Sequence, residues 1–428
     1  MKNYKTIRYE KLEEQYFEYQ HKSGLQVFVI PKKGYSKKTA YFITKYGSLD
    51  NKFRPYGETA FVKVPDGIAH FLEHKLFEQE HGNVMDRFAA LGSSPNAYTS
   101  YNKTAYYFSC TDQFTDNLRL LLQYVQTPYL TEENVEKEKG IIEQEIMMYE
   151  DHPGYKVYSN MMKGLYHNHP VRDSVAGTVE SVNQITKELL MQCYNTFYHP
   201  SNMILVVAGD VEQEQVFRIV AEEIQHTESR PKIWRVLPEE PETVAQSDIK
   251  ESAQIGLPTF EIGLKCKELS GNKEEDMMRV VAGKMVMKEL FQSGSEIYEQ
   301  LFAAGLINDS FDYACAYEQT YANMIIGGES PDPEKAKEQL YAYILEKQKT
   351  GIDPAALERN KKSMKGMFFK RLNSVENIAS SFVTDYFRGI NLFDYFNVYD
   401  TIGVDYANEV LRNDVCVDRA VMSVIDKA

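Results

Sequence analysis

The stretch His70-Phe71-Leu72-Glu73-His74 is the most informative part of this sequence. Two histidines four positions apart on a helix share one face, so both imidazoles can reach a single ion. Glu73 precedes the second histidine by one residue, which puts its carboxylate within reach of a water molecule on that ion. This order, H-x-x-E-H, is a signature of zinc-dependent hydrolases. It predicts a zinc-binding helix; the alternative is two surface histidines beside a solvated glutamate.

The composition indicates a globular enzyme of two domains. The chain has 428 residues, of which 43% are hydrophobic, enough for two cores of about 200 residues each. Its formal charge is -14, and no basic stripe is present to neutralise phosphates. We therefore expect no nucleic-acid partner, whereas basic peptides would suit this charge.

The cysteines and the apolar segments predict a cytoplasmic protein. No two cysteines have C-x-x-C spacing, which favours reduced thiols over disulfides or a thiolate zinc site. The N-terminal residues lack the apolar core of a signal peptide, and no apolar run is long enough to span a bilayer. We expect no membrane partner. The five cysteines are Cys110, Cys193, Cys266, Cys315 and Cys416.

A proline- and glutamate-rich stretch divides the chain into two similar halves. Such a composition resists helix and strand, so we expect a linker at residues 231–244 between domains at 1–230 and 245–428. Three weak matches in the same chain order indicate that the halves are repeats. They pair residues 131–139 with 353–361, 75–77 and 88–92 with 289–291 and 302–305, and 204–210 with 420–426.

Periodicity predicts the same architecture in both halves. Apolar spacing indicates helices at 70–77, 116–125 and 132–149, and residues 96–101 and 104–110 resemble a β-hairpin. We expect an α+β fold of two homologous domains, each a mixed, largely antiparallel sheet packed with helices.

The repeat shows which half carries the chemistry. In the second half, Lys284, Met287 and Lys288 stand where the first half has the two histidines and the glutamate of the motif. None of these three can reproduce a zinc site. The metal site is therefore expected in the N-terminal domain alone.

A third zinc ligand is expected on the helix at 132–150. Glu138, Ile142, Glu145 and Tyr149 share one of its faces, and a carboxylate among apolar neighbours is unusual unless it is paired or binds metal. The repeat replaces the two glutamates by asparagine and methionine. This correlated loss favours Glu145 as ligand and Glu138 as its support. The alternative is that Glu145 pairs with a lysine.

With these residues the chain resembles the pitrilysin or insulinase-type zinc metallopeptidases, the inverzincins, and within them the half-length group that includes mitochondrial processing peptidase. Among bacterial members it looks closest to the YmfH-like proteins. The resemblance covers nearly the whole chain. Its most specific segments are 67–74, 96–99, Glu138 with Glu145, 198–203 and 209–210.

The resemblance implies a peptidase with one Zn²⁺ per chain. His70, His74 and Glu145 would hold the zinc, which lowers the pKa of bound water to about 7. Glu73 would act as general base and then acid. The resemblance also implies that Glu138 supports catalysis, and that Asn96 and Ala97 lie on an edge strand to which an extended peptide substrate adds.

One departure from the family concerns the second domain. Members that act alone carry an Arg and a Tyr seven residues apart, which help to bind the substrate. The aligned positions here are Phe302 and Asp309, and neither can do that work. We therefore expect a dimer, either a homodimer of low activity or a heterodimer with a paralogous subunit that supplies the Arg-Tyr pair.

Three other functions stay open at this point. The chain could be an inactive peptide-binding or scaffold subunit of a heterodimeric processing peptidase. It could hydrolyse a small molecule, although an edge strand suits a peptide better. It could also be an accessory protein that binds peptides without turnover.

Overall fold

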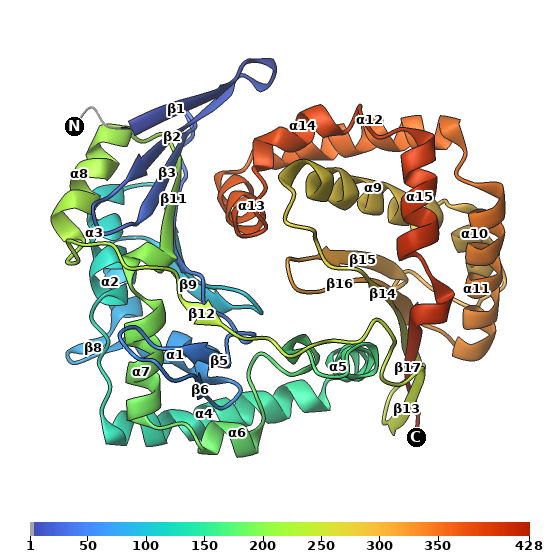
Figure 1. Cartoon of the computed structure of the whole chain (residues 1–428), viewed down its shortest axis with the longest axis horizontal. Coiled ribbons are helices and arrows are strands. Elements are labelled where there is room, and N and C mark those ends of the chain that lie inside the picture. The colour runs from blue at the N-terminus through green and yellow to red at the C-terminus, as the bar shows by residue number, and fades with distance from the viewer. Residues whose placement is uncertain (1–3) are drawn as a thin grey trace. The chain divides into compact units, whose positions relative to one another are not determined.

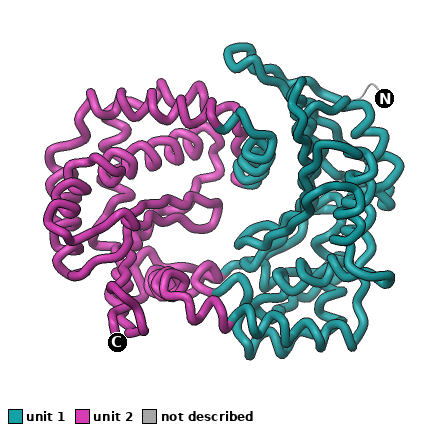
Figure 2. Tube along the Cα trace, turned by 180° about the vertical axis from the view of Figure 1, so that it is seen from behind, with its two compact units in different colours: residues 1–146, 174–237, 371–387 teal, residues 147–173, 238–370, 388–428 magenta. Residues whose placement is uncertain are grey.

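The computed structural model describes residues 4–428 and contains two compact units (Figures 1 and 2). Unit 1 comprises Met1–Ile146, Ser174–Leu237 and Arg371–Phe387. Unit 2 comprises Met147–Asp173, Pro238–Lys370 and Arg388–Ala428. Each unit combines helices with a largely antiparallel sheet, as the sequence predicts.

Unit 1 is built on a seven-stranded sheet in the order β1-β2-β3-β11-β4-β10-β9. All its neighbours are antiparallel except β3 and β11, which run parallel. The strands are β1 Tyr4–Tyr9, β2 Glu14–Gln20, β3 Gln26–Pro31, β4 Lys38–Thr44, β9 Ser94–Thr99, β10 Thr104–Cys110 and β11 Met203–Gly209. Small sheets are formed by β5 Lys52–Arg54, β6 Val62–Lys63 and β12 Trp234–Arg235, and by β7 Glu78–Gln79 and β8 Gly82–Asn83.

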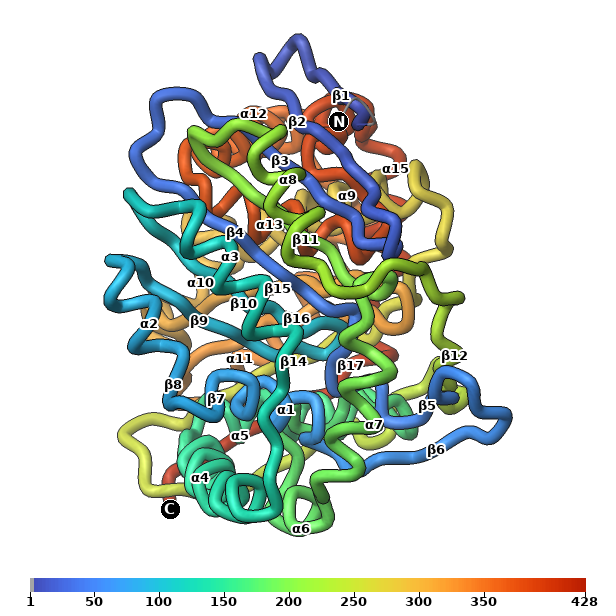
Figure 3. The backbone as a smooth tube through the Cα atoms, turned by 90° about the vertical axis from the view of Figure 1, so that its left-hand side faces the viewer, coloured from blue at the N-terminus to red at the C-terminus, as the bar shows by residue number. Residues whose placement is uncertain are grey.

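Helices cover both faces of this sheet, and Figure 3 shows α3 and α8 in front of its strands. Because β11 is central and covered on both sides, its sequence is a continuous apolar run in which every residue is buried. The helices are α1 Ile68–Phe77, α2 Val84–Ala90, α3 Phe114–Val125, α4 Glu132–Asp151, α6 Val179–Asn183, α7 Lys187–Phe197, α8 Gln213–Glu223 and α13 Val375–Phe387. The last residues of α4 belong to unit 2.

Unit 2 has a five-stranded sheet in the order β13-β17-β14-β16-β15. Its strands are β13 Asp248–Ala253, β14 Thr259–Cys266, β15 Asp312–Tyr317, β16 Ala322–Glu329 and β17 Ala420–Lys427. Its helices are α5 Pro153–Leu165, α9 Lys273–Phe291, α10 Glu296–Ala303, α11 Pro333–Thr350, α12 Pro354–Arg371, α14 Tyr395–Val398 and α15 Val404–Asp414.

The two sheets repeat one topology. β13, β17, β14, β16 and β15 follow one another in the same directions as β3, β11, β4, β10 and β9, with the same single parallel pair. The sequence matches fall on equivalent elements, since α1 and α9, α2 and α10, and α4 and α12 occupy corresponding places in chain order.

One match is out of register by one residue. The 3-10 turns Pro200–Asn202 and Val417–Arg419 directly precede β11 and β17, so Met203 corresponds to Ala420. The sequence match had paired residue 204 with 420. Such a slip would move every side chain to the opposite face of the sheet, and apolar similarity cannot detect it in a strand buried on both faces.

One boundary between the compact units, at Leu237 and Pro238, falls within the expected linker at residues 231–244, but two helices lie outside a division at this point. Residues 147–173, with α5, belong to unit 2, and residues 371–387, with α13, belong to unit 1. The two helices follow α4 and α12 in equivalent chain positions, so each repeat contributes one helix to the other unit. α13 packs its Phe382 ring against Phe28 of β3, with ring centroids 5.0 Å apart. Amphipathic periodicity predicts such a helix but not which sheet it covers.

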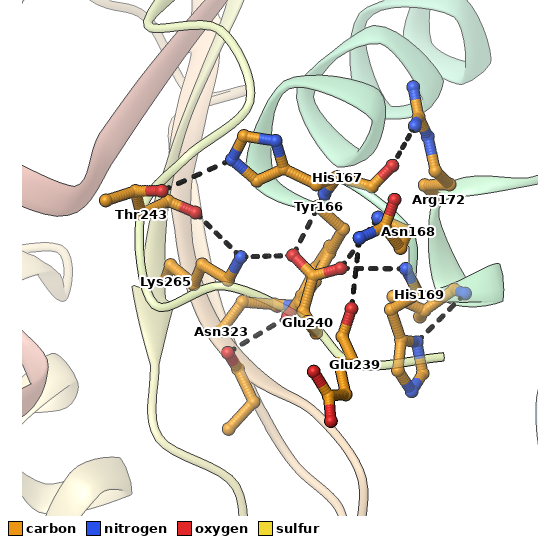
Figure 4. A network of polar contacts seen from close by, with 12 residues as sticks. Tyr166, His167, Asn168, His169, Arg172, Glu239, Glu240, Thr243, Lys265 and Asn323 are labelled. Carbon is orange, nitrogen blue, oxygen red and sulfur yellow. Dashed lines mark hydrogen bonds and ion pairs between the residues drawn. The ribbon is translucent and has the colours of Figure 1, made fainter. Parts of the chain in front are cut away.

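The segment expected to be a linker makes specific contacts at both of its ends. Trp234 and Arg235 form β12, which pairs with β5 in unit 1. In unit 2 the Glu240 carboxylate accepts hydrogen bonds from the backbone N–H groups of residues 167–169 (Figure 4). It also pairs with the buried Lys265 at 2.5 Å. Burial alone would raise the pKa of Glu240, but the bond from Lys265 and the backbone bonds lower it to about 2.

Residues 4–428 contain neither a helix that could span a membrane nor a disulfide. No helix in this range combines the length and the apolar character needed to cross a bilayer. All five cysteines fall within it and are free thiols, of which Cys110, Cys193 and Cys266 are buried.

The Glu240 contacts generate a stability prediction. Glu240→Gln keeps the shape of the side chain but leaves the Lys265 ammonium buried without a counter-charge. We expect the free energy of unfolding to fall by about 2–3 kcal/mol, measured by chemical denaturation. The matched control is Glu239→Gln, because that side chain is exposed and only its backbone carbonyl is used. An equal loss in both variants would contradict a specific role for Glu240.

Candidate metal centre

The start of α1 is fixed by a glycine. Gly67 has φ +90°, and a Cβ there would lie 2.4 Å from the carbonyl oxygen of Ala176. Only glycine tolerates both the left-handed conformation and this approach. The neighbouring Asp66 accepts a hydrogen bond from Asn51 through its side chain and one from Ser181 through its backbone. These contacts set where the helix begins and therefore which way its histidines point.

The two faces of α1 differ in burial. Phe71, Leu72 and Leu76 are fully buried in the core of unit 1. The side chains of His70 and His74 lie one turn apart on the other face. The exposed fractions of these side chains are 12% and 24%. Their ring centroids are 4.5 Å apart. The predicted helix and the shared histidine face are both present.

Glu145 of α4 lies beside both histidines. Its carboxylate oxygens are 3.7 Å from Nε2 of His70 and 3.4 Å from Nε2 of His74. One ligand atom from each of the three residues lies within 4.8 Å of the others, and no second group of this kind occurs in residues 4–428. The structure thus brings together the three residues that the sequence singled out as ligands.

The donor set fits zinc. Two imidazole nitrogens and one carboxylate make up a common set for a catalytic zinc. Ligands about 2.1 Å from one ion in a tetrahedral arrangement lie roughly 3.4 Å apart, close to the separations between Glu145 and the histidines. The site is partly open, as an ion that must also take up water requires.

His74 is oriented by Glu138. Its Nδ1 lies 3.0 Å from a carboxylate oxygen of Glu138, which leaves Nε2 for the ion. Burial opposes charge on both groups, but their mutual hydrogen bond raises the pKa of His74 and lowers that of Glu138. The other oxygen of Glu138 is 3.7 Å from Nζ of Lys75, which is fully buried and also pairs with Glu78.

His70 has no comparable support. Its Nδ1 is buried and has no hydrogen-bond partner among the described residues. Burial, followed by the neighbouring His74, lowers the pKa of His70 to about 4. The ring is therefore neutral near pH 7, which is the form that binds metal.

Glu73 is held by a threonine of the edge strand. Its carboxylate is buried and accepts a 2.7 Å hydrogen bond from Oγ1 of Thr99 on β9. Burial raises the pKa of Glu73, although the bond from Thr99 opposes this. A carboxylate with a raised pKa in a partly open site is suited to accept and return a proton.

Asn96 and Ala97 lie on β9, the last strand of the sheet, paired on one side only, with β10. The N–H of Ala97 donates to the side-chain oxygen of its own neighbour Asn96 at 2.9 Å. The strand thus has a free edge on the element that also carries Thr99.

Two residues of the site were missed from the sequence. Lys75 directly follows the motif and shares the buried face of α1, and a lysine on an apolar face is a signal for a buried partner. Thr99 lies in a stretch that indicates a strand, but nothing in the sequence says that its hydroxyl reaches Glu73.

In unit 2 the equivalent places carry no metal site. Met287 is buried in the core, and Lys284 lies over the ring of Tyr395. Phe302 is 46% exposed and stacks on Tyr298, and Asp309 lies in the turn before β15. The loss of ligands inferred from the repeat matches these positions.

Comparison with known proteins gives a consistent result. The model of the insulinase family (peptidase family M16) matches residues 63–179, and that of the peptidase M16 inactive domain matches residues 184–364. The chain is 40% identical over 428 residues to the uncharacterized zinc protease YmfH of Bacillus subtilis, covering 99% of this chain and 100% of that one. It is 26% identical over 195 residues to a probable mitochondrial-processing peptidase subunit beta of Arabidopsis thaliana, covering 44% of this chain and 35% of that one.

Solved structures agree. A crystal structure of an M16-like peptidase from Alicyclobacillus acidocaldarius matches with a TM-score of 0.92 and 35% identity, covering 100% of this chain and 99% of that one. A peptidase M16 inactive domain from Pseudomonas fluorescens, at 15% identity and a TM-score of 0.81, covers 96% of this chain and 98% of its own and shares the fold. With the repeated fold and the H-x-x-E-H helix, the full-length match shows that this chain belongs to peptidase family M16, the insulinase family of zinc proteases.

Proposed function

We propose that this chain is a zinc-dependent endopeptidase that hydrolyses peptides or short unfolded segments. The observation that carries the proposal is the approach of His70 and His74 to Glu145, with the buried Glu73 one position before the second histidine. One zinc ion per chain, held by these three side chains, would polarise a carbonyl group and lower the pKa of a water molecule to about 7.

The chain's own residues then handle the proton. Glu73 accepts the proton of the attacking water through its carboxylate and returns it to the leaving amine. Thr99 holds one oxygen of that carboxylate in place, which leaves the other for the water. Glu138 keeps the ring of His74 in the orientation that directs Nε2 towards the ion.

The free edge of β9 favours a peptide over a small-molecule substrate. An extended peptide can pair with an edge strand through its backbone, whereas a small molecule cannot. The N–H of Ala97 now donates to Asn96, and a peptide carbonyl would replace that contact. The net charge of -14 suits basic peptides, and five free thiols suit the cytoplasm.

Two substitutions separate proton transfer from metal binding. Glu73→Gln should retain stoichiometric zinc but lose hydrolysis of an unfolded peptide by about a thousandfold or more, because an amide cannot accept the proton. His70→Ala should lose zinc, measured by metal analysis after dialysis. The exposed neighbours give matched controls, Glu80→Gln and His81→Ala. Parent-level cleavage by Glu73→Gln would refute this mechanism.

Glu138 supports the ligand His74 and is not itself one of the three residues that would hold the ion. Glu138→Gln should therefore weaken zinc binding by about 10–100-fold, measured by competition with a chelator. Glu133→Gln, exposed in the first turn of the same helix, should bind zinc as the parent does. Equal zinc affinity in the parent and in Glu138→Gln would show that His74 does not need this partner.

The second domain points to a partner subunit. Phe302 and Asp309 cannot replace the Arg and Tyr of family members that act alone, so the chain acts as a dimer, either with itself at low activity or with a paralogous subunit. Size-exclusion chromatography with light scattering should give a dimer for the purified chain, or a monomer that cleaves peptides weakly until the paralogue is added. A fully active monomer would contradict this.

The alternative is a peptide-binding or scaffold subunit with little or no activity. It is favoured by the same two positions and opposed by the complete ligand set of unit 1. Zinc content together with peptide cleavage decides between the two functions.

A further inference from the structure

Three paired residues lie side by side across the sheet of unit 2, and the middle one is a glycine, which has no side chain. Glu261 of β14 pairs with Gly327 of β16, which pairs in turn with Asp312 of β15. Residues paired across strands project from the same face, so the two carboxylates flank a position without a side chain. A Cβ on Gly327 would lie 2.3 Å from the carbonyl oxygen of Phe260 and 2.9 Å from Cγ of Glu261.

This face is the one covered by α5. Gly263, two residues after Glu261 on the same side of β14, lies directly under Met161 and Leu165 of α5. Towards the start of the helix the cover ends, and a cavity of about 840 Å³ opens between the first turns of α5 and the strands. All of its lining residues belong to unit 2.

The cavity is acidic but has apolar walls. Glu261, Asp312 and Glu329 line it, and neither a lysine nor an arginine is among its lining residues. No ion pair between these three carboxylates and a basic side chain occurs in residues 4–428. Val157, Leu257 and the rings of Tyr158 and Tyr313 provide apolar and aromatic surface.

Of the three carboxylates, Glu261 has the fewest hydrogen-bond partners. Asp312 accepts a hydrogen bond from the N–H of Tyr313, and Glu329 accepts one from Asn308. The Oε2 atom of Glu261 is buried without a hydrogen-bond partner among the described residues. Burial raises the pKa of this carboxyl to about 7. A cation in the cavity would supply the missing partner.

The corresponding place in unit 1 is filled. Because Met203 corresponds to Ala420, their strand partners Thr44 and Leu264 correspond as well. Counting back along both strands, Glu261 corresponds to Tyr41, and Gly327 corresponds to Tyr107, the partner of Tyr41. In unit 1 these two rings stack 4.5 Å apart. Unit 2 therefore has a carboxylate and open space where its repeat has packed aromatic rings.

The first turn of α5 also lines the cavity, and a helix N-terminus favours anions. Its partial charge amounts to about half an elementary charge, against three carboxylates. Pro153 has no N–H to offer, and the N–H of Tyr155 is taken by Nδ1 of His152. The carboxylates therefore determine the sign of the preferred ligand.

We propose that this cavity binds a guanidinium or alkylammonium group on an apolar stem, with Glu261 as its counter-ion, Asp312 flanking it, and the tyrosine rings against the stem. Arginine or lysine side chains have this chemistry, and so do free amines such as agmatine. The cavity is far larger than one cationic group, so it has room for the residues next to it. This binding does not depend on zinc or on hydrolysis.

The test measures binding of Nα-acetyl-arginine amide to the full chain by titration calorimetry, with the citrulline amide as its neutral isostere. The arginine probe should bind the parent at least about tenfold more tightly than citrulline does. Glu261→Gln should remove that difference. Glu338→Gln, an equal charge change on the exposed face of α11, should leave it intact. Asp312→Asn, an exposed position where misfolding is not expected, should weaken binding about threefold.

Equal binding of arginine and citrulline would overturn the proposal, and so would unchanged arginine binding in both Glu261→Gln and Asp312→Asn. Absence of arginine binding at millimolar concentration would overturn it as well. Agmatine separates the two sources of the cation. Tighter binding of agmatine than of the amide supports a free amine, and the reverse order supports a peptide side chain.

Discussion

Glu138 accepts a hydrogen bond from His74 with one carboxylate oxygen and faces the buried ammonium of Lys75 with the other. Both partners belong to α1, so this one carboxylate of α4 fixes how the two helices meet. Seven residues later, two turns further along α4, Glu145 is carried to the open face beside the histidines. The geometry of the ligands thus depends on a buried polar contact between the ligand His74 and Glu138, which is not itself a ligand. Removing Glu138 would disturb the ring of His74 and the helix packing together.

Unit 2 keeps this contact and changes its chemistry. Asn360, the counterpart of Glu138, donates to Glu289 at 2.5 Å and accepts from Gln292 at 3.4 Å, and these two residues stand where unit 1 has Lys75 and Glu78. The neighbouring pair also recurs, since Lys139 binds Glu136 and Lys361 binds Glu358, each at 2.6 Å. The repeated fold therefore keeps a polar contact between these helices without an ion pair at Asn360 and without metal ligands. Unit 2 thus has the same scaffold without the metal ligands.

The sequence predicted those features that depend on spacing along one element. Helical phase brought His70 and His74 together and selected Glu145, and the loss of their counterparts in the repeat supported the choice. Features that depend on which element packs on which sheet could not be predicted from the sequence. The exchange of α5 and α13 between the units is one, because an amphipathic helix fits either of two homologous sheets. The hydrogen bond from Thr99 to Glu73 and the cavity at Glu261 are two more such features. Both depend on the register of the strands, and a register shift of one residue would abolish them.

A buried carboxylate without a partner lowers the stability of a fold by about 1–3 kcal/mol unless something offsets it. Unit 1 contains a buried carboxylate in Glu73, whose pKa burial raises although Thr99 donates a hydrogen bond to it, and there the chemistry of the site gives it a role. Unit 2 contains the partly buried Glu261, whose Oε2 atom is buried without a hydrogen-bond partner among the described residues, at a position that its repeat fills with a tyrosine. The presence of glutamate opposite a glycine is therefore best explained by a ligand that completes the site, and the acidic lining gives that ligand a positive charge.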